Sequence, residues 1–288
     1  MKTWIFFLSF MAFVGVAWAQ EADFEQWKIK RTAELTGEDG WLNLAGLFWM
    51  EARSPFLEEA NSTLGFAEKA GFATLGKFEF GQDSVWFVGT SLLNQEKNSV
   101  SELNRTLVFP TAYGSGGVYF KNWKWTIIQR GGNYALRLRD LSHPNLREFT
   151  PTPTFDYNST FRLPAKLIPR FNQTMDIPNV LGQVISWKVI GVLQFEYEGK
   201  DFELLVLDEL GKLFVLFSDD TSALETYPTG RYLYVNPPDA KGMTLLDFNY
   251  AYNPPCAYTE FATCPIPPKS NRLPFAVQAG EKMPAGHK

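Results

Sequence analysis

The segment VISWKVIGVLQFEYEGKDFELLVLDELGKLFVLF spans residues 184–217 and contains four apolar runs. The runs are rich in Val, Ile, Leu and Phe, and β-branched and aromatic residues favour strands. We expect strands at residues 184–190, 192–197, 201–207 and 212–217. Residues 198–201 and 209–211 each contain a glycine, which is typical of tight turns. The segment therefore predicts an antiparallel meander.

Similar short apolar segments lie on both sides of this meander. They predict further strands at residues 73–80, 84–88, 105–109, 118–120, 124–130, 134–140, 232–235 and 243–248. The turn at residues 131–133 joins two of them as a hairpin. Repeated short strands with tight turns predict a mainly β fold, an antiparallel barrel or sandwich.

Only one segment indicates a helix. Phe24, Trp27, Ala33 and Leu35 recur among charged residues in residues 22–36, a spacing typical of an amphipathic helix. The stretch that follows, residues 41–49, is too apolar for a surface loop, so we expect it to be buried.

Six prolines occur in residues 143–178. Proline lacks the N–H that a central strand donates. This stretch therefore predicts a long Pro-rich crossover made of loop and edge structure.

Residues 1–19 have the three regions of a secretory signal peptide. Lys2 supplies the charge, an apolar run extends from Trp4 to Trp18, and Ala17 and Ala19 mark a small-residue cleavage site. The apolar run is shorter than the roughly 20 residues of a membrane span, so a membrane anchor is the weaker alternative. We expect cleavage after Ala19, export to the periplasm or the medium, and no membrane span in the mature chain.

The length of residues 20–288 suits one large domain or two small ones, and we expect a single β-rich domain. Hydrophobic residues make up 45% of the chain, which is enough for a substantial core. The net charge of -4 provides no basic surface for phosphates, so we expect no nucleic-acid partner.

The chain has two cysteines, Cys256 and Cys264. We expect them to form a disulfide, because the compartments that receive exported proteins are usually oxidising. A metal-binding pair is the alternative. In the chain-entropy model, closing so short a loop contributes about 2 kcal/mol or somewhat more.

Familiar catalytic and cofactor signatures are absent. The sequence has no Gly-X-Ser-X-Gly, no phosphate-binding Gly-X-X-X-X-Gly-Lys followed by Ser or Thr, no Gly-X-Gly-X-X-Gly after a strand and no His-Glu-X-X-His. Two histidines are few for a zinc site or a histidine-based triad. The sequence therefore identifies no cofactor, no metal site and no reaction.

Polar residues next to apolar strands are the candidates for a site. Arginines with carboxylates can bind an anionic or hydroxyl-rich ligand, with Trp and Tyr rings as apolar walls. The predicted ligand-binding residues are Arg139, Asp140, Asp219, Tyr227, Arg231, Asp247 and Asn249. In the structural alternative, Arg231 pairs with Asp219 or Asp247 and ties loops together.

These residues suit two functions. The first is a binding module for a small polar or carbohydrate-like ligand. The alternative is a hydrolase of the cell envelope, in which Asp219 and Asp247 act as acid and base or hold a divalent metal. A structural envelope protein without a ligand is the third possibility.

Several runs of the chain carry a family resemblance. The most specific is LDFNYAYNPPCA, residues 246–257, and the others are residues 40–49, 217–222, 225–227, 230–233, 263–268, 271–273 and 279–282. Together they resemble the bacterial family called domain of unknown function 1684. The resemblance implies membership of that family and no established activity. The family pattern has a glycine where this chain has Ala223, which weakens the prediction of a tight turn there.

Overall fold

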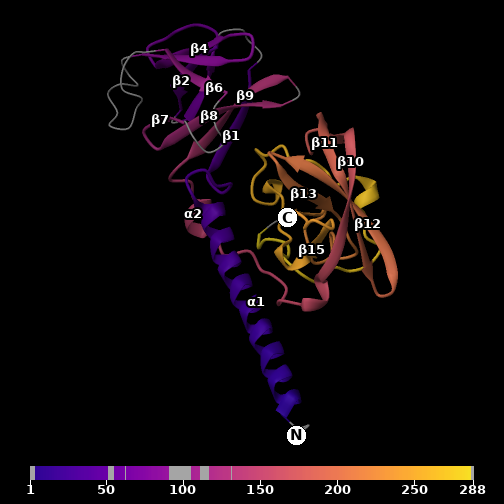
Figure 1. Cartoon of the computed structure of the whole chain (residues 1–288). Coiled ribbons are helices and arrows are strands. Elements are labelled where there is room, and N and C mark those ends of the chain that lie inside the picture. Colours follow the sequence, from indigo (N-terminus) through magenta and orange to yellow (C-terminus); the bar gives the residue numbers. More distant parts are fainter. Residues whose placement is uncertain are drawn as a thin grey trace. The chain divides into compact units, whose positions relative to one another are not determined.

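The computed structural model describes residues 4–50, 55–61, 63–90, 105–110, 117–130 and 132–286, apart from the side chains of residues 4–19 and 60. One long helix, α1 (Trp4–Thr36), precedes a series of antiparallel strands (Figure 1). A second helix, α2 (Asn145–Glu148), is a single turn. The predicted mainly β fold with an N-terminal helix is confirmed.

The strands form three antiparallel sheets. Their orders are β1-β9-β8-β7, β3-β2-β4-β5-β6 and β14-β13-β12-β11-β10-β15. The strand bounds are β1 Leu44–Trp49, β2 Phe56–Ala60, β3 Thr63–Ala67, β4 Thr74–Phe80, β5 Val85–Gly89, β6 Arg105–Phe109, β7 Val118–Phe120, β8 Trp123–Arg130, β9 Asn133–Asp140, β10 Arg162–Pro178, β11 Val184–Tyr197, β12 Lys200–Glu209, β13 Lys212–Phe217, β14 Arg231–Val235 and β15 Met243–Asp247.

The chain divides into two compact units. Unit 1 consists of Met1–Glu34, Thr150–Tyr258 and Thr263–Lys288 and contains the six-stranded sheet. Unit 2 consists of Leu35–Phe149 and Thr259–Ala262 and contains the other two sheets. The single β-rich domain expected over residues 20–288 stays a prediction.

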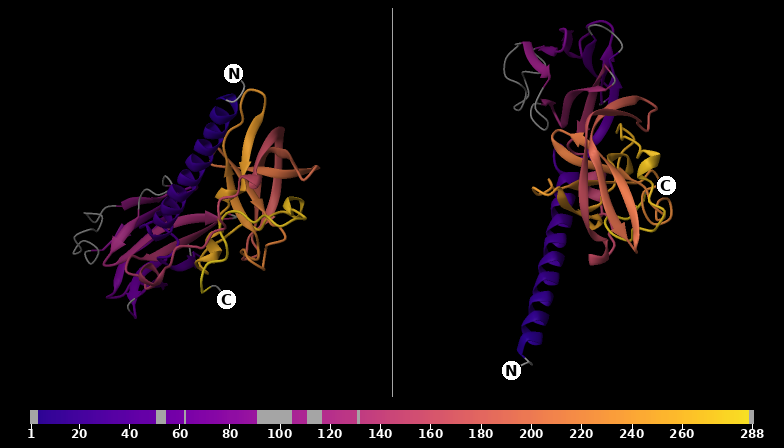
Figure 2. Two further views of the ribbon diagram at one scale, coloured as in Figure 1. Left: turned by 90° about the horizontal axis from the view of Figure 1, so that it is seen from below. Right: turned by 45° about the vertical axis from the view of Figure 1, so that its right-hand side comes forward.

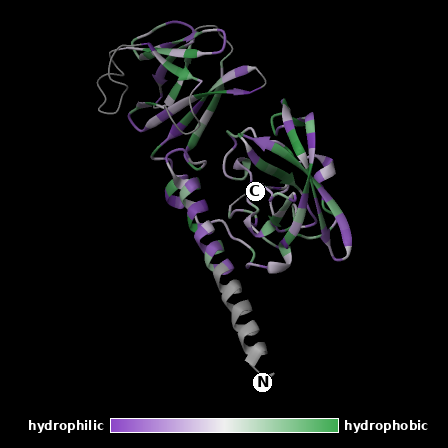
Figure 3. Ribbon diagram, viewed as in Figure 1, coloured by the Kyte–Doolittle hydropathy of each residue, from purple (hydrophilic) through white to green (hydrophobic). Residues whose placement is uncertain are grey.

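The helix α1 begins before the segment expected to be helical. It runs without a break from Trp4, whereas the sequence predicts a helix from residue 22. In Figure 3 the coloured part of α1 is mostly hydrophilic, and hydrophobic residues gather along the strands. Within the described part of the chain, no helix combines the length and the apolar character needed to cross a membrane. The signal peptide expected over residues 1–19 stays a prediction.

The predicted meander forms the centre of the six-stranded sheet, where β12 pairs with β11 and β13. One boundary needs correction, because the strands expected at residues 184–190 and 192–197 are a single strand, β11. Gly191 explains the difference. A Cβ at this position would lie 2.3 Å from the carbonyl oxygen of Ile168. The glycine thus lets β11 pass close to β10 without interrupting the strand.

The Pro-rich crossover is present, but its second half is a strand. β10 pairs with β11 on one side, and its register shifts between Pro169 and Gln173. On the other side, β15 pairs only with Arg162–Lys166. The prolines are tolerated because proline fits at bulges and on strand edges.

The core of unit 1 lies between the six-stranded sheet and the C-terminal segment. Leu193, Leu204 and Phe217 of the sheet are fully buried and belong to one apolar cluster with Leu273 and Val277. Figure 2 shows this C-terminal segment, in yellow, beside the sheet. The segment has little strand of its own, but burial of apolar surface makes it part of the core.

Unit 2 has a separate aromatic core. The Phe78 ring lies 4.9 Å from Phe87 and 5.3 Å from Trp125, measured between ring centroids. β8 and β9 pair with each other as the predicted hairpin requires, although residue 131 of its turn lies outside the described residues. The stretch expected to be buried, residues 41–49, contains β1, which pairs with β9.

Candidate functional site

Asp219 and Arg231 form a buried ion pair in unit 1. Arg231 Nη2 lies 2.9 Å from Asp219 Oδ2, and neither side chain is exposed to solvent. The guanidinium also donates to the carbonyl oxygens of Val277 and Ala279. The other carboxylate oxygen, Oδ1, accepts from the backbone N–H and the hydroxyl of Thr221. The pair therefore ties β14 to the C-terminal segment, as the structural alternative for Arg231 predicts.

The turn after Asp219, which the sequence predicts only weakly because of Ala223, does form. Ala223 adopts a left-handed conformation with φ of 67°. Its backbone N–H donates to the carbonyl of Thr226, and the N–H of Thr226 donates to the carbonyl of Thr221. The turn is thus made at the cost of an unfavourable backbone conformation, which amounts to roughly 1–2 kcal/mol for residues other than glycine.

Ala223→Gly should therefore stabilise the protein. The gain should be about 0.5–1 kcal/mol, because the larger unfolded-state entropy of glycine offsets part of the relieved strain. Urea unfolding measures the difference. The matched control is Ala240→Gly at an exposed alanine outside the left-handed region, which should lower stability. An equal loss in both variants would contradict the explanation.

Asp247 and Asn249 lie next to one another at the end of β15. Asp247 Oδ1 accepts from the backbone N–H and the side-chain amide of Asn249, which caps the 3-10 turn Phe248–Tyr250. Asn249 is fully buried and also binds the backbone of Asn158. The second oxygen, Asp247 Oδ2, lies 3.4 Å from Arg162 Nε. This pair follows from strand pairing, because Arg162 and Asp247 are register partners in β10 and β15.

Asp247 and Arg162 are only partly enclosed, in contrast to Asp219 and Arg231. The side chain of Asp247 is 14% exposed and that of Arg162 is 35% exposed. Burial raises the pKa of Asp247, and this effect outweighs its hydrogen bonds with Asn249 and the charge of Arg162. A carboxyl group with a raised pKa beside an arginine that reaches solvent is a candidate functional group.

Two tyrosines lie near this carboxylate, and aromatic rings of α1 contact both of them. Burial raises the pKa of Tyr157 to about 12, and the charge of Asp247 adds to the shift. The pKa of Tyr250 is also raised, by burial and by the charge of Asp247. The Phe24 ring lies 5.9 Å from Tyr157, and the Trp27 ring lies 5.6 Å from Tyr250. We name Asp247, Arg162, Tyr157, Tyr250 and Trp27 the Asp247 cluster.

The other predicted site residues lie elsewhere. Tyr227 is buried, which raises its pKa. Arg139 and Asp140 belong to unit 2, where Arg139 is buried and donates to Gly40 and Asn43. Asp140 accepts from Asn122 and Ser142. The structure thus brings together Asp219 with Arg231, and Asp247 with Asn249. A ligand-binding role for the whole set stays a prediction.

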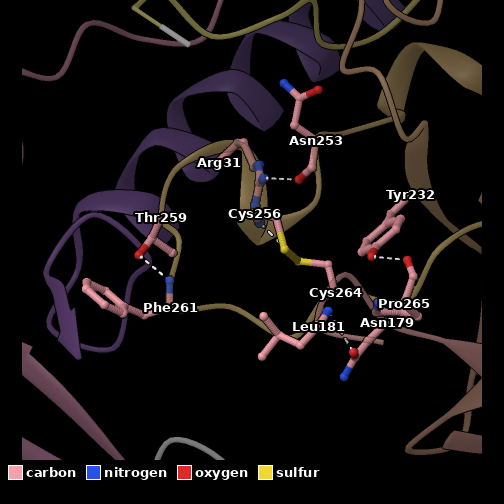
Figure 4. The surroundings of a disulfide bond; sticks show 10 residues. All are labelled: Arg31, Asn179, Leu181, Tyr232, Asn253, Cys256, Thr259, Phe261, Cys264 and Pro265. Carbon is pink, nitrogen blue, oxygen red and sulfur yellow. Dashed lines mark hydrogen bonds between the residues drawn. A yellow bond between two sulfur atoms is a disulfide. The ribbon is translucent and has the colours of Figure 1, made fainter. Parts of the chain in front are cut away.

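Cys256 and Cys264 lie within bonding distance, as predicted. Figure 4 shows their surroundings. The backbone N–H of Val180 donates to the carbonyl of Cys264, and the hydroxyl of Tyr232 donates to the carbonyl of Pro265. These bonds fix the cysteine segment on β14 and on the turn after β10.

A second buried ion pair anchors α1 to the C-terminal segment of unit 1, and sequence reasoning missed it. Arg31 Nε lies 2.9 Å from Glu281 Oε1, and the Glu281 side chain is 1% exposed. Glu281 also accepts from the N–H of Asn253 and the hydroxyl of Tyr258. Arg31 donates to the carbonyl of Asn253, which Figure 4 shows, and lies 4.7 Å from the Tyr252 ring.

Among the residues that the structure describes, no group of three or more His, Cys, Asp or Glu side chains is placed to hold a metal ion.

These features define an antiparallel β protein whose C-terminal segment completes the core and contains a disulfide loop. Residues 147–282 match the family described as "Protein of unknown function (DUF1684)", and the chain belongs to this family. The match includes the Asp247 cluster apart from Trp27, and both halves of the Asp219–Arg231 pair.

Two further comparisons concern individual proteins. One is an uncharacterised protein of Haloarcula marismortui whose structure was solved by solution NMR. Its sequence is 31% identical to this chain over a match that covers 50% of this chain and 83% of that chain, and the TM-score is 0.42. No curated protein matches the chain.

Proposed function

We propose that the protein is exported and binds a small polar or carbohydrate-like ligand at the Asp247 cluster. One observation carries the proposal: Asp247 and Arg162 are a paired acid and base that remain partly exposed. A carboxylate and a guanidinium side by side offer acceptors and donors to hydroxyl groups or to a small organic acid. Tyr157, Tyr250 and Trp27 supply the apolar ring faces against which such a ligand packs.

The hydrolase alternative is less well supported. It requires Asp219 and Asp247 to reach one substrate as acid and base, or to share a metal ion. The Asp219 side chain is fully buried and bonded to Arg231, so releasing it would leave Arg231 uncompensated in the core. We therefore assign Asp219 and Arg231 to the framework and Asp247 to the ligand site, where Asn249 holds its carboxylate in place.

Asp247→Asn tests the proposal with little risk to the fold. Asparagine still accepts the two hydrogen bonds from Asn249 through its side-chain oxygen, but loses the charge that faces Arg162. In a thermal-shift screen against sugars, small organic acids and divalent metals, a ligand at 100 times its Kd should stabilise the parent by about 2.7 kcal/mol. That gain corresponds to a rise in Tm of roughly 5–10 °C for a protein of this size. We expect the shift to disappear in Asp247→Asn.

The matched control is Asp201→Asn, which makes the same chemical change at an exposed carboxylate of β12. This variant should retain the full shift. A ligand that shifts parent and Asp247→Asn equally would place its site elsewhere. No shift with any compound would favour the structural envelope protein and contradict the proposal.

The raised pKa of Asp247 predicts how the stability of this variant depends on pH. The folded state holds the Asp247 proton more tightly than the unfolded state, so ionising this group costs stability as pH rises through the folded pKa. Asp247→Asn should therefore be at least as stable as the parent at neutral pH. This advantage should vanish below the unfolded pKa of Asp247. A large loss of stability at neutral pH would show that Asp247 serves the fold instead.

A further inference from the structure

Gln20 lies at the cleavage position that the signal-like sequence predicts. It would be the first residue of the mature chain, since cleavage is expected after Ala19. Its side chain is partly buried, and its amide oxygen Oε1 accepts a hydrogen bond of 3.2 Å from the hydroxyl of Tyr157. Tyr157, which lies in the irregular stretch before β10, thus binds the side-chain amide of the residue that would become the N-terminus.

We propose that Gln20 is a modification site, at which the mature chain cyclises to an N-terminal pyroglutamate. The free α-amine of Gln20 attacks Cδ of its own side-chain amide. A bond forms between the α-nitrogen and Cδ, the bond between Cδ and Nε2 breaks, and a proton from the amine leaves with Nε2 as ammonia. The step consumes no oxidant, reductant or cofactor. It rests on the proposed cleavage, and not on the ligand of the Asp247 cluster.

Tyr157 is placed to promote this reaction. Its hydroxyl donates to Oε1, the oxygen that gains negative charge when the amine attacks Cδ. A hydrogen-bond donor aimed at such an oxygen lowers the barrier. The pKa of Tyr157 is raised to about 12 by burial, so the hydroxyl keeps its proton at physiological pH. Oε1 is retained as the carbonyl oxygen of the lactam, so the product still has an acceptor for the Tyr157 hydroxyl.

The product also suits the start of the mature helix. Cleavage makes Gln20 the N-terminus of the remaining part of α1, where the helix dipole favours negative charge and disfavours a protonated amine. Glu21 and Asp23 follow in the first turn and satisfy this preference. Cyclisation removes the positive charge of the α-amine, so the modified helix should be the more stable form.

Intact-mass measurement of the exported protein tests the inference. The full chain, with its own leader and a C-terminal tag, is expressed in a bacterium and recovered after export. We expect the mass of residues 20–288 lowered by one ammonia, and an N-terminus blocked to sequential degradation. Gln20→Ala should give an open N-terminus at residue 20, which establishes the cleavage independently. A free amine on Gln20 in the aged parent, or any other first residue, would overturn the proposal.

Tyr157→Phe tests the role of the hydroxyl. The substitution keeps the ring that contacts Phe24 and removes only the donor. In freshly purified protein, the uncyclised fraction should decay several-fold more slowly in this variant than in the parent. Unfolding the parent in urea should slow its cyclisation to a similar rate, which checks the result if Tyr157→Phe folds poorly. Equal rates in folded parent, unfolded parent and variant would refute any part for Tyr157. Because ligand-induced thermal shifts are measured separately, failure here leaves the ligand proposal standing.

Discussion

Replacing Arg231 with methionine should lower the free energy of unfolding by about 3–5 kcal/mol, because breaking a buried pair leaves an uncompensated charge in the core. Arg231 is fully buried, and it joins Asp219 to the carbonyl oxygens of Val277 and Ala279. Methionine retains much of the apolar volume but none of the donors. Urea unfolding of parent and variant measures the loss as a shift of the unfolding midpoint, provided that the m-value is the same in both.

Two controls separate the ion pair from other effects of the substitution. Arg272→Met removes the same side chain from a pair with Asp220 in which both partners are 46% exposed, and it should cost at most about 1 kcal/mol. The double variant Arg231→Met with Asp219→Asn should recover part of the stability, since the unpaired charge is gone. Equal losses at Arg231 and Arg272 would contradict the buried-pair explanation.

Replacing Arg31 with methionine should have an effect of similar size, again about 3–5 kcal/mol. Glu281 is buried and depends on Arg31 for charge compensation, while its bonds from Asn253 and Tyr258 remain. The substitution should also loosen α1 from the C-terminal segment of unit 1. Limited proteolysis within residues 20–34 should accelerate in step with the fall in stability.

Lys30→Met is the matched control for α1, because Lys30 is 77% exposed and lies 3.9 Å from Glu34. Its effect should stay within about 0.5 kcal/mol. Combining Arg31→Met with Glu281→Gln should restore part of the loss. If Arg31→Met unfolds no more easily than Lys30→Met, the helix is not anchored by this pair.

The strands could be predicted because their signals are local. β6, β7 and β13 occupy the residues expected from apolar runs and turn glycines. The split at Gly191 was wrong, because the glycine serves a close approach of Ile168 that only the paired sheet creates. The sequence does not predict β2 and β3, although they pair with each other in the structure. Their residues show no strong alternation and no clear turn signal.

The site could be predicted only in part, for a similar reason. The sequence predicts Asp247 and Asn249 as site residues together. Their contact is local, because the two residues are only two positions apart in the chain. The sequence does not predict Arg162 and Tyr157 as site residues, because they reach Asp247 only through the pairing of β10 with β15 and the path of the preceding loop. The sequence allows Arg231 to pair with Asp219 or with Asp247, and only the fold decides between them.

The contact between Arg31 and Glu281 also bears on where the folded unit that contains the family match begins. The family match covers residues 147–282, and it includes Glu281 and the rings of Tyr252 and Tyr258 but not the arginine that lies against them. A fragment cut at the limits of the match would keep a buried acid without its base. Unit 1 is therefore discontinuous in sequence. The family match alone would place its N-terminal boundary too late in the chain.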